Sequence, residues 1–231
     1  MRPVRTARVV RINDHASDTR SLFFEIDGAP LGFTPGQFIS IQIPLMDEVR
    51  TRAYTLASSP GEPVLEIVFN RVAGGRGVEW LFERAIGDEI SFVGPFGTFT
   101  LEKAPAVETV FVAEGTAIAP IRPMLRRAST TPGHPRLTLI FAARTELHLI
   151  YRDEFAALAQ RDPQFGFETM LAPADQLYAR LRTEIARRFV AESDDRSRVF
   201  YLCGVGKPVV ELRDLLRGAD YERRAVHYEQ W

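Results

Sequence analysis

Alternation of hydrophobic and polar residues with a period of two dominates the first hundred residues of the chain. This period is typical of β-strands that bury one face. One helix is expected, from about Val78 to Ala85. The expected strands are separated by turns rich in glycine and proline, and they span residues 4–12, 19–26, 37–43, 52–56, 64–72 and 88–93. Short, regularly spaced strands of this kind predict a small antiparallel β-barrel.

The pattern changes after residues 103–108, KAPAVE, where a proline interrupts the alternation. Short apolar runs then alternate with segments of helical periodicity. Strands are expected at 109–113, 136–144, 165–171, 198–204 and 223–231, and helices at 118–128, 151–161, 175–190 and 207–218. This alternation predicts an α/β doubly wound parallel sheet. We therefore expect two domains, residues 1–103 and 104–231.

Composition excludes several classes of protein. The 231 residues carry a net charge of −1 without a long block of one sign, which argues against nucleic acid as a main partner. The beginning of the chain does not have the features of a signal peptide, and no apolar run approaches the roughly 20 residues that span a bilayer. A cytoplasmic protein without membrane insertion is the expectation. The single cysteine, Cys203, excludes a disulfide framework and a four-cysteine cluster, and the isolated histidines indicate no metal site.

The carboxyl ends of the expected parallel strands are rich in small residues. Such sheets bind ligands at these ends, where the strand order reverses. The ends read EGTA (114–117), AAR (142–144), LAPAD (171–175) and CGVGK (203–207). These residues favour a nucleotide site, although ordinary turns between helices and strands also collect glycine.

Two motifs in the first half suit a phosphate-bearing aromatic ligand. In RAYT, Arg52 and Tyr54 project from one strand face, and they offer a rigid fork of donors and a flat ring. In GGRGVEWL, Gly75 and Gly77 precede or begin a helix and let backbone N–H groups approach a phosphate. A solvent-facing cross-strand pair and a plain glycine turn are the alternative interpretations.

Eight motifs occur in one order along nearly the whole chain. They are FTPGQF (33–38), RAYT (52–55), GGRGVEWL (74–81), GPFGTF (94–99), VAEGTAIAP (112–120), FAAR (141–144), YLCG (201–204) and HYEQW (227–231). In this order the chain resembles the ferredoxin–NADP reductase superfamily, in its compact form without a fused iron–sulfur domain. The resemblance implies a flavin-binding barrel followed by an NAD(P)-binding domain. It also implies a flavin-dependent NAD(P)H oxidoreductase that passes electrons to an external ferredoxin, flavodoxin or oxygenase component.

The resemblance assigns roles to individual residues. The flavin is expected to bind at Arg52, Ala53, Tyr54, Thr55, Val68, Phe69, Gly75, Arg76, Gly77 and Val78. The nicotinamide nucleotide is expected at Gly115, Thr116, Ala117, Pro120, Arg144, Cys203 and Gly204. Thr55, Cys203, Glu229 and Trp231 are expected beside the reacting atoms, where the Trp231 ring covers the flavin and gates access of nicotinamide.

Departures from the family pattern leave alternatives open. Val78 replaces a serine or threonine, so FMN remains possible beside FAD, as does a flavin reductase whose flavin dissociates. Glu114 and Ala117 in the nucleotide motif, with Lys207 nearby, suggest instead a flavin-binding subunit or sensor with a degenerate nicotinamide site. The segment LAPAD lacks the serine–arginine pair that binds the 2′-phosphate, which favours NADH over NADPH unless Arg180 or Arg182 substitutes.

Overall fold

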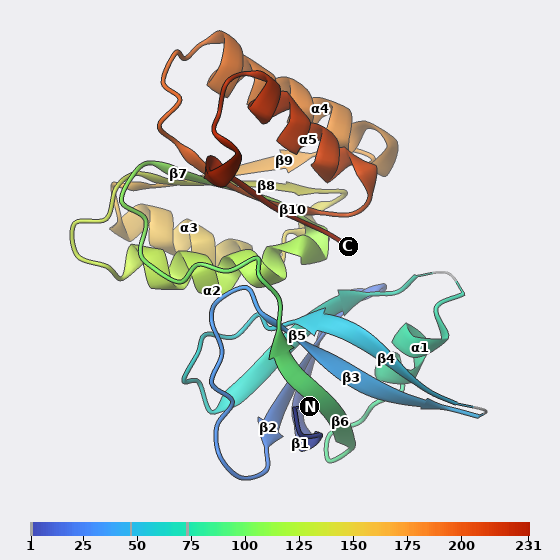
Figure 1. The fold of residues 1–231 in the computed structure, drawn as a ribbon. Helices are drawn as coiled ribbons and strands as arrows, with labels where there is room; N and C mark the ends of the chain where they lie inside the picture. Colours follow the sequence, from blue (N-terminus) through green and yellow to red (C-terminus); the bar gives the residue numbers. More distant parts are fainter. Residues whose placement is uncertain (1, 47, 73) are drawn as a thin grey trace.

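The computed structural model describes residues 2–46, 48–72 and 74–231, and it contains two β-sheets (Figure 1). The first sheet is antiparallel and has the order β4-β3-β6-β1-β2-β5. Its two edge strands approach each other at one bridge, between Leu56 and Ile67. The strands are β1 (Arg5–Ala16), β2 (Thr19–Ile26), β3 (Phe38–Leu45), β4 (Glu48–Thr55), β5 (Val64–Asn70) and β6 (Glu89–Phe96). The predicted antiparallel domain is confirmed.

Alternating side chains build the interior of this barrel. Ile39, Ile41 and Ile43 of β3 are fully buried, as the period-two pattern predicts. Helix α1 (Arg76–Phe82) packs Leu81 into the same core. The helix ends before the predicted Ala85, because the Ala85 N–H donates to the Asp88 carboxylate at 3.0 Å and forms a turn there.

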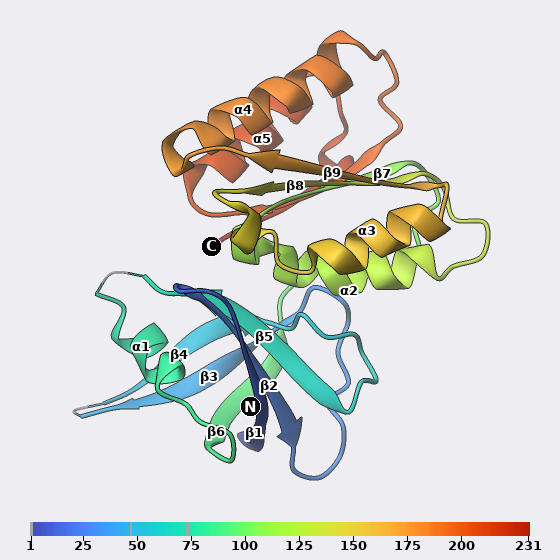
Figure 2. The ribbon, with the colours of Figure 1, turned by 180° about the vertical axis from the view of Figure 1, so that it is seen from behind.

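The second sheet is parallel and has the order β11-β10-β7-β8-β9. Its strands are β7 (Thr109–Glu114), β8 (Leu137–Ala143), β9 (Phe165–Leu171), β10 (Val199–Gly204) and β11 (Val226–Gln230). Helices α2 (Ile118–Ser129) and α3 (Arg152–Arg161) cover one face, and α4 (Ala174–Ala186) and α5 (Lys207–Gly218) cover the other (Figures 1 and 2). The predicted doubly wound sheet is confirmed, although α4 ends early in a wider π-helical turn, Arg187–Ala191.

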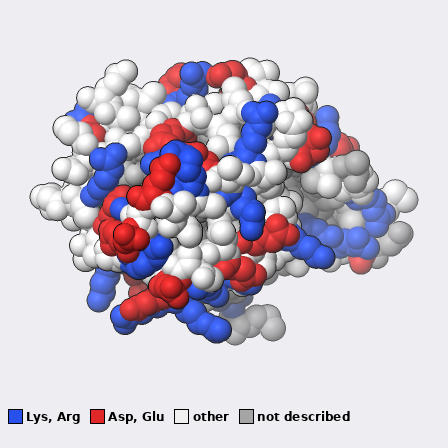
Figure 3. Space-filling model, turned by 90° about the horizontal axis from the view of Figure 1, so that it is seen from above, with Lys and Arg blue, Asp and Glu red and all other residues white. Residues whose placement is uncertain are grey.

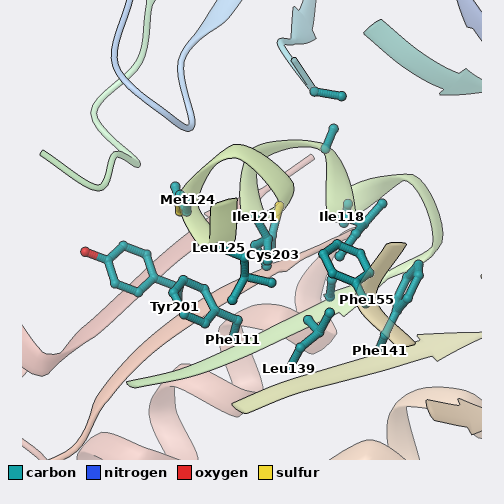
Figure 4. Packing of buried hydrophobic residues seen from close by; sticks show 14 of the residues in the cluster. Phe111, Ile118, Ile121, Met124, Leu125, Leu139, Phe141, Phe155, Tyr201 and Cys203 are labelled. Carbon is teal, nitrogen blue, oxygen red and sulfur yellow. The ribbon is translucent and has the colours of Figure 1, made fainter. Parts of the chain in front are cut away.

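The apolar core beneath the parallel sheet extends into the first half of the chain. Phe111 and Tyr201 stack there with ring centroids 5.4 Å apart, beneath helix α2 (Figure 4). Phe99 and Leu101, which lie before the predicted boundary, pack into the same cluster. The boundary between residues 103 and 104 therefore remains a prediction.

The reversal of strand order lies between β7 and β10, whose carboxyl ends are adjacent through the pairing of Ala113 with Cys203. Acidic and basic side chains are intermixed on the face of the molecule that Figure 3 shows. Among the described residues, no helix is long and apolar enough to cross a membrane.

Candidate functional site

A cavity of about 730 Å³ lies between the barrel and the carboxyl ends of the parallel sheet. Ten predicted flavin-binding residues lie in its wall: Arg52, Ala53, Tyr54, Thr55, Val68, Phe69, Gly75, Arg76, Gly77 and Val78. Thr116, Glu229 and Trp231 close it from the second domain. The structure thus brings together thirteen predicted residues from three distant parts of the chain.

Strand β4 supplies the polar groups of the barrel wall. The Tyr54 ring lies edge-on to Phe69, with centroids 5.8 Å apart, while Thr55 is buried and Arg52 is exposed. Burial raises the pKa of Tyr54 to about 12, against the opposing effect of the Arg52 charge. The Tyr54 phenol is therefore protonated at neutral pH and can donate a hydrogen bond to a ligand.

The glycine segment brings α1 close to the barrel. A Cβ atom on Gly77 would lie 3.0 Å from Ile43 Cδ1 and 3.6 Å from Arg52 Cγ, so a larger residue would push the helix away. The Val78 N–H already donates to the Gly75 carbonyl at 3.0 Å, and the Val78 side chain packs into the barrel core. A contact from Val78 to a phosphate remains a prediction.

Trp231 is tied to the loop that follows β10. Its N–H donates to the Gly204 carbonyl, and its carbonyl accepts from the Gly206 N–H, both at 3.1 Å. Its indole N–H donates to Glu229 Oε2 at 3.1 Å. Burial raises the pKa of Glu229, although the hydrogen bond from Trp231 opposes this effect. The two side chains form a hydrogen-bonded pair at the cavity wall.

Five further predicted nucleotide residues lie near the strand reversal but outside the cavity wall. Gly115 has a φ of +53°, and a Cβ atom there would meet no atom within 4 Å. Ala117 and Pro120 are buried in or beside α2. Burial, together with the nearby Glu229 charge, raises the pKa of the Cys203 thiol well above its ordinary value. Gly204 leaves room for the Tyr178 hydroxyl, which would lie 2.2 Å from an added Cβ.

Glu114 lies on the α4 side of the parallel sheet. Val110 and Val112, which share its strand face, pack into the cluster of α4 and α5. Burial and the nearby Glu114 carboxylate raise the pKa of the Tyr178 phenol on α4. Glu114 Oε2 is buried and has no hydrogen-bond partner in the part of the chain that the structure describes. The carboxylate is thus directed toward α4 rather than toward α2.

Arg144 lies outside the cavity and contacts the barrel domain. It donates to Asp18 Oδ2 at 2.7 Å, and His148 Nε2 donates to Asp18 Oδ1 at 2.9 Å. Burial alone would raise the pKa of Asp18, but hydrogen bonds from Arg144, His148 and Thr19 outweigh it and lower the pKa to about 2. The predicted contact of Arg144 with the nucleotide remains a prediction, and its observed partner is the turn between β1 and β2.

The cavity wall also contains residues that the sequence analysis missed. Arg50 alternates with Arg52 and Tyr54 on one strand, so the period-two pattern could have identified it. No sequence pattern identifies Asn70 as a residue of the cavity wall. Its Oδ1 accepts a hydrogen bond from Thr116 Oγ1 at 3.3 Å, a contact that only the domain arrangement creates.

The chemistry of the wall suits a planar aromatic ligand that carries phosphate. Arg50 and Arg52 supply guanidinium groups, which favour a diphosphate. Tyr54 and Thr55 supply hydroxyl groups, and Val68 and Phe69 supply apolar surface. The residues present therefore fit FAD, and the volume of the cavity lies within the range of cofactor sites.

Comparison with known families identifies both halves of the chain. The oxidoreductase FAD-binding domain family matches residues 6–101, which include the strands of the cavity wall. The oxidoreductase NAD-binding domain family matches residues 111–211, which include most of β7 and all of β8 to β10.

Individual relatives extend over both domains. The chain is 33% identical to ferredoxin–NADP reductase B of Sorangium cellulosum, over 97% of this chain and 96% of that protein. It is 28% identical to the glycine betaine monooxygenase reductase subunit of Pseudomonas aeruginosa, over 96% of this chain but 63% of that protein. The crystal structure of an Amycolatopsis cytochrome P450 reductase superposes with a TM-score of 0.82 at 26% identity, covering 100% of this chain and 71% of that one.

Proposed function

Because the chain belongs to the ferredoxin–NADP reductase family, we propose that its cavity holds FAD and that NAD(P)H delivers reducing equivalents there. One observation carries the proposal. A single cavity joins the donors of β4 to Thr116 and Trp231 of the second domain. A flavin ring against β4 and a nicotinamide ring at the strand reversal would therefore meet in one enclosed space.

The barrel residues hold and orient the flavin. Arg50 and Arg52 bind the diphosphate, while the protonated Tyr54 and the Thr55 hydroxyl donate hydrogen bonds to the ring. FAD supplies the chemistry that no side chain offers, because it accepts an electron pair from nicotinamide and releases single electrons. Val68 and Phe69 exclude water from one side of the ring site.

The second domain controls access of the nucleotide. Thr116 and the open space at Gly115 receive the nucleotide, and Trp231 covers the position that nicotinamide must occupy. Nicotinamide binding then requires Trp231 to break its hydrogen bond with Glu229. Glu229 borders this position from β11, and Cys203, which pairs with it on β10, lies just behind the cavity wall.

NADH is the proposed reductant in preference to NADPH. The segment 171–175 offers no arginine for a 2′-phosphate. Arg144 is paired with Asp18, and Arg180 donates to Gln176. Arg144 and Arg180 would each have to leave a present partner to bind a 2′-phosphate, and the other candidate, Arg182, is exposed on α4.

A flavin reductase with a dissociable flavin is the second candidate. The observation that favours it is Val78, whose side chain provides no hydroxyl and whose N–H bonds to Gly75. A degenerate nicotinamide site receives less support, because Glu114 is directed toward α4 and does not place its carboxylate beside α2.

An external redox protein is the proposed electron acceptor. Relatives are named as a reductase subunit of a monooxygenase, as an electron transfer component of a dioxygenase and as a ferredoxin–NADP reductase. The chain spans 63% of the glycine betaine monooxygenase reductase subunit, so the identity of the acceptor is proposed by class only, as a ferredoxin, a flavodoxin or an oxygenase component. The cytoplasm, where NAD(P)H is produced, is the proposed location.

Gel filtration of the purified yellow protein distinguishes the two candidates. We expect the flavin absorbance to elute with the protein, and acid extraction followed by chromatography to identify FAD rather than FMN. A colourless protein that regains colour only in excess flavin would instead support the flavin reductase.

A further inference from the structure

Residues 62–70 and 116–126 lie side by side across the domain interface and run in opposite directions. Three polar contacts join them in order: Asn70 with Thr116, Glu66 with Arg122, and Glu62 with Arg126. The views from both sides place β5 against the helices of the second domain (Figures 1 and 2). We call these three contacts the interdomain ladder.

The central contact of the ladder is almost entirely buried. Glu66 is 3% exposed. Its carboxylate accepts hydrogen bonds from Ser21 Oγ at 2.8 Å, from the Tyr151 hydroxyl at 2.7 Å and from Arg122. Arg122 also donates to Glu154 at 2.9 Å. Buried charges are tolerated only when they are paired and hydrogen-bonded in this way, so the geometry of the cluster is tightly constrained.

Tyr151 holds a conformation that few residues other than glycine adopt. Its φ is +62°, in the left-handed region. The same conformation brings its hydroxyl to Glu66 and its ring 3.9 Å from the Arg122 guanidinium carbon. Such strain persists where surrounding interactions fix the residue, and it commonly marks a functional constraint. Arg122 remains charged there: burial would lower its pKa, but the groups around it raise it.

The ladder connects the two walls of the cavity. Arg122 Nη1 donates to the Ala57 carbonyl at 3.2 Å, and the Ala57 N–H donates to the Glu66 carbonyl at 2.8 Å. Ala57 follows the cavity residue Thr55 by two positions, and Glu66 precedes Val68 by two. Arg122 therefore attaches both flavin-lining strands to helix α2, whose first turn follows Thr116.

We propose that Glu66, Arg122 and Tyr151 are positioning residues, which align the nucleotide-binding end of α2 with the flavin-lining strands β4 and β5. This inference rests on the proposed function. Hydride transfer needs the reacting atoms at about 3 to 3.5 Å, and a misplacement of about 1 Å can slow a reaction about a hundredfold. The residues themselves lie outside the cavity wall, so they act through the placement of α2.

Stopped-flow reduction of the flavin by NADH tests the alignment directly. In Tyr151→Phe and Glu66→Gln we expect the limiting reduction rate to fall about ten- to hundredfold, with the Kd of the nucleotide and the flavin content unchanged. Arg122→Lys should retain more of the rate than Arg122→Gln, because it keeps the charge. Glu108→Gln is the matched control, since Glu108 pairs with Arg198 inside the second domain at 2.8 Å.

Folded variants that keep the wild-type rate would overturn the proposal. A loss that appears entirely in the Kd of the nucleotide would also overturn it, because alignment acts after binding. Circular dichroism and the melting temperature verify that each variant is folded. If Glu66→Gln does not fold, the limiting reduction rate of Tyr151→Phe, which lacks a single hydroxyl, tests the positioning role instead.

A distance measurement tests the ladder independently of catalysis. Spin labels on Glu25→Cys of β2 and Asp194→Cys of the second domain report the separation of the domains, while the buried Cys203 resists labelling. We expect a broader distance distribution in Tyr151→Phe and Glu66→Gln than in the otherwise wild-type or Glu108→Gln proteins. Equal distributions would overturn the positioning role. If the protein does not react with NADH or NADPH, the proposed function is wrong. The distance distributions would still show whether the interdomain ladder holds the two domains in a fixed arrangement.

Discussion

Arg52 is the residue of the cavity wall whose position and charge best suit the diphosphate of a flavin. It stands on β4 next to Ala53 and Tyr54, and its guanidinium is exposed at the cavity wall. Its guanidinium donates to the neighbouring Thr51 carbonyl at 2.9 Å. Within the part of the chain that the structure describes, the guanidinium has no carboxylate partner, so it is available to a diphosphate.

Replacing Arg52 by alanine should weaken FAD binding. Hydrogen bonds to charged groups contribute about 1.5 to 3 kcal/mol each, so we expect the Kd of FAD to rise roughly ten- to hundredfold. Flavin fluorescence during titration of the apoprotein measures this change. Arg8→Ala, which removes an exposed arginine paired with Glu89, serves as the control. Equal affinity of the Arg52→Ala and wild-type proteins for FAD would contradict the assignment.

The direction of the Glu114 side chain could not be predicted from the residue type alone. A carboxylate in the nucleotide motif suggested repulsion of a diphosphate. Period two along β7 predicts that Glu114 shares a face with Val112, but the sequence does not tell which helices cover that face. That assignment depends on the crossover of α4 to the other side of the sheet, which local periodicity does not encode.

At the level of elements, most strands and helices could be predicted because their periodicity is strong. The strands β7 to β11 and the helices α2, α3 and α5 lie within two or three residues of their expected positions. The ends of α1 and α4 differed, because a side-chain turn at Asp88 and a π-helical turn after Ala186 terminate them. Contacts between distant elements, such as the hydrogen bond from Arg144 to Asp18, could not be predicted from local sequence patterns.

The contact between the β1–β2 turn and the end of β8 should make stability depend on pH. Asp18 has a folded-state pKa of about 2, below the ordinary 3.8. Its stabilisation is therefore present above about pH 4 and is lost as the pH falls toward 2. Because its side chain is 30% exposed, we expect a contribution of about 1 to 2 kcal/mol, less than full burial would give.

Chemical denaturation of Asp18→Asn checks this contribution. The variant should be less stable than wild type at pH 7 by that amount, and the difference should vanish near pH 2. Asp194→Asn, at an exposed site, should follow wild type throughout. A constant difference between Asp18→Asn and wild type from pH 7 to pH 2 would show that the carboxylate charge is not responsible.

At the scale of the whole molecule, two sheets with different topologies share one cavity. The barrel contributes hydroxyl and guanidinium groups, and the parallel sheet contributes the strand reversal and the Trp231 rim. The order of the motifs along the chain predicted that the barrel would bind the flavin and that the parallel sheet would bind the nucleotide. The buried attachment of α2 to β5 through Arg122 and Glu66 was not predicted, because each residue alone resembles an ordinary surface charge.

Anaerobic titration of the purified protein with NADH, followed by its absorbance spectrum, tests the central claim most directly. The account predicts that the flavin band bleaches with about one equivalent of NADH, because one nicotinamide delivers one electron pair. NADPH, titrated separately, should bleach the band only at higher concentration. A flavin that stays oxidised in an excess of both nucleotides would contradict the account.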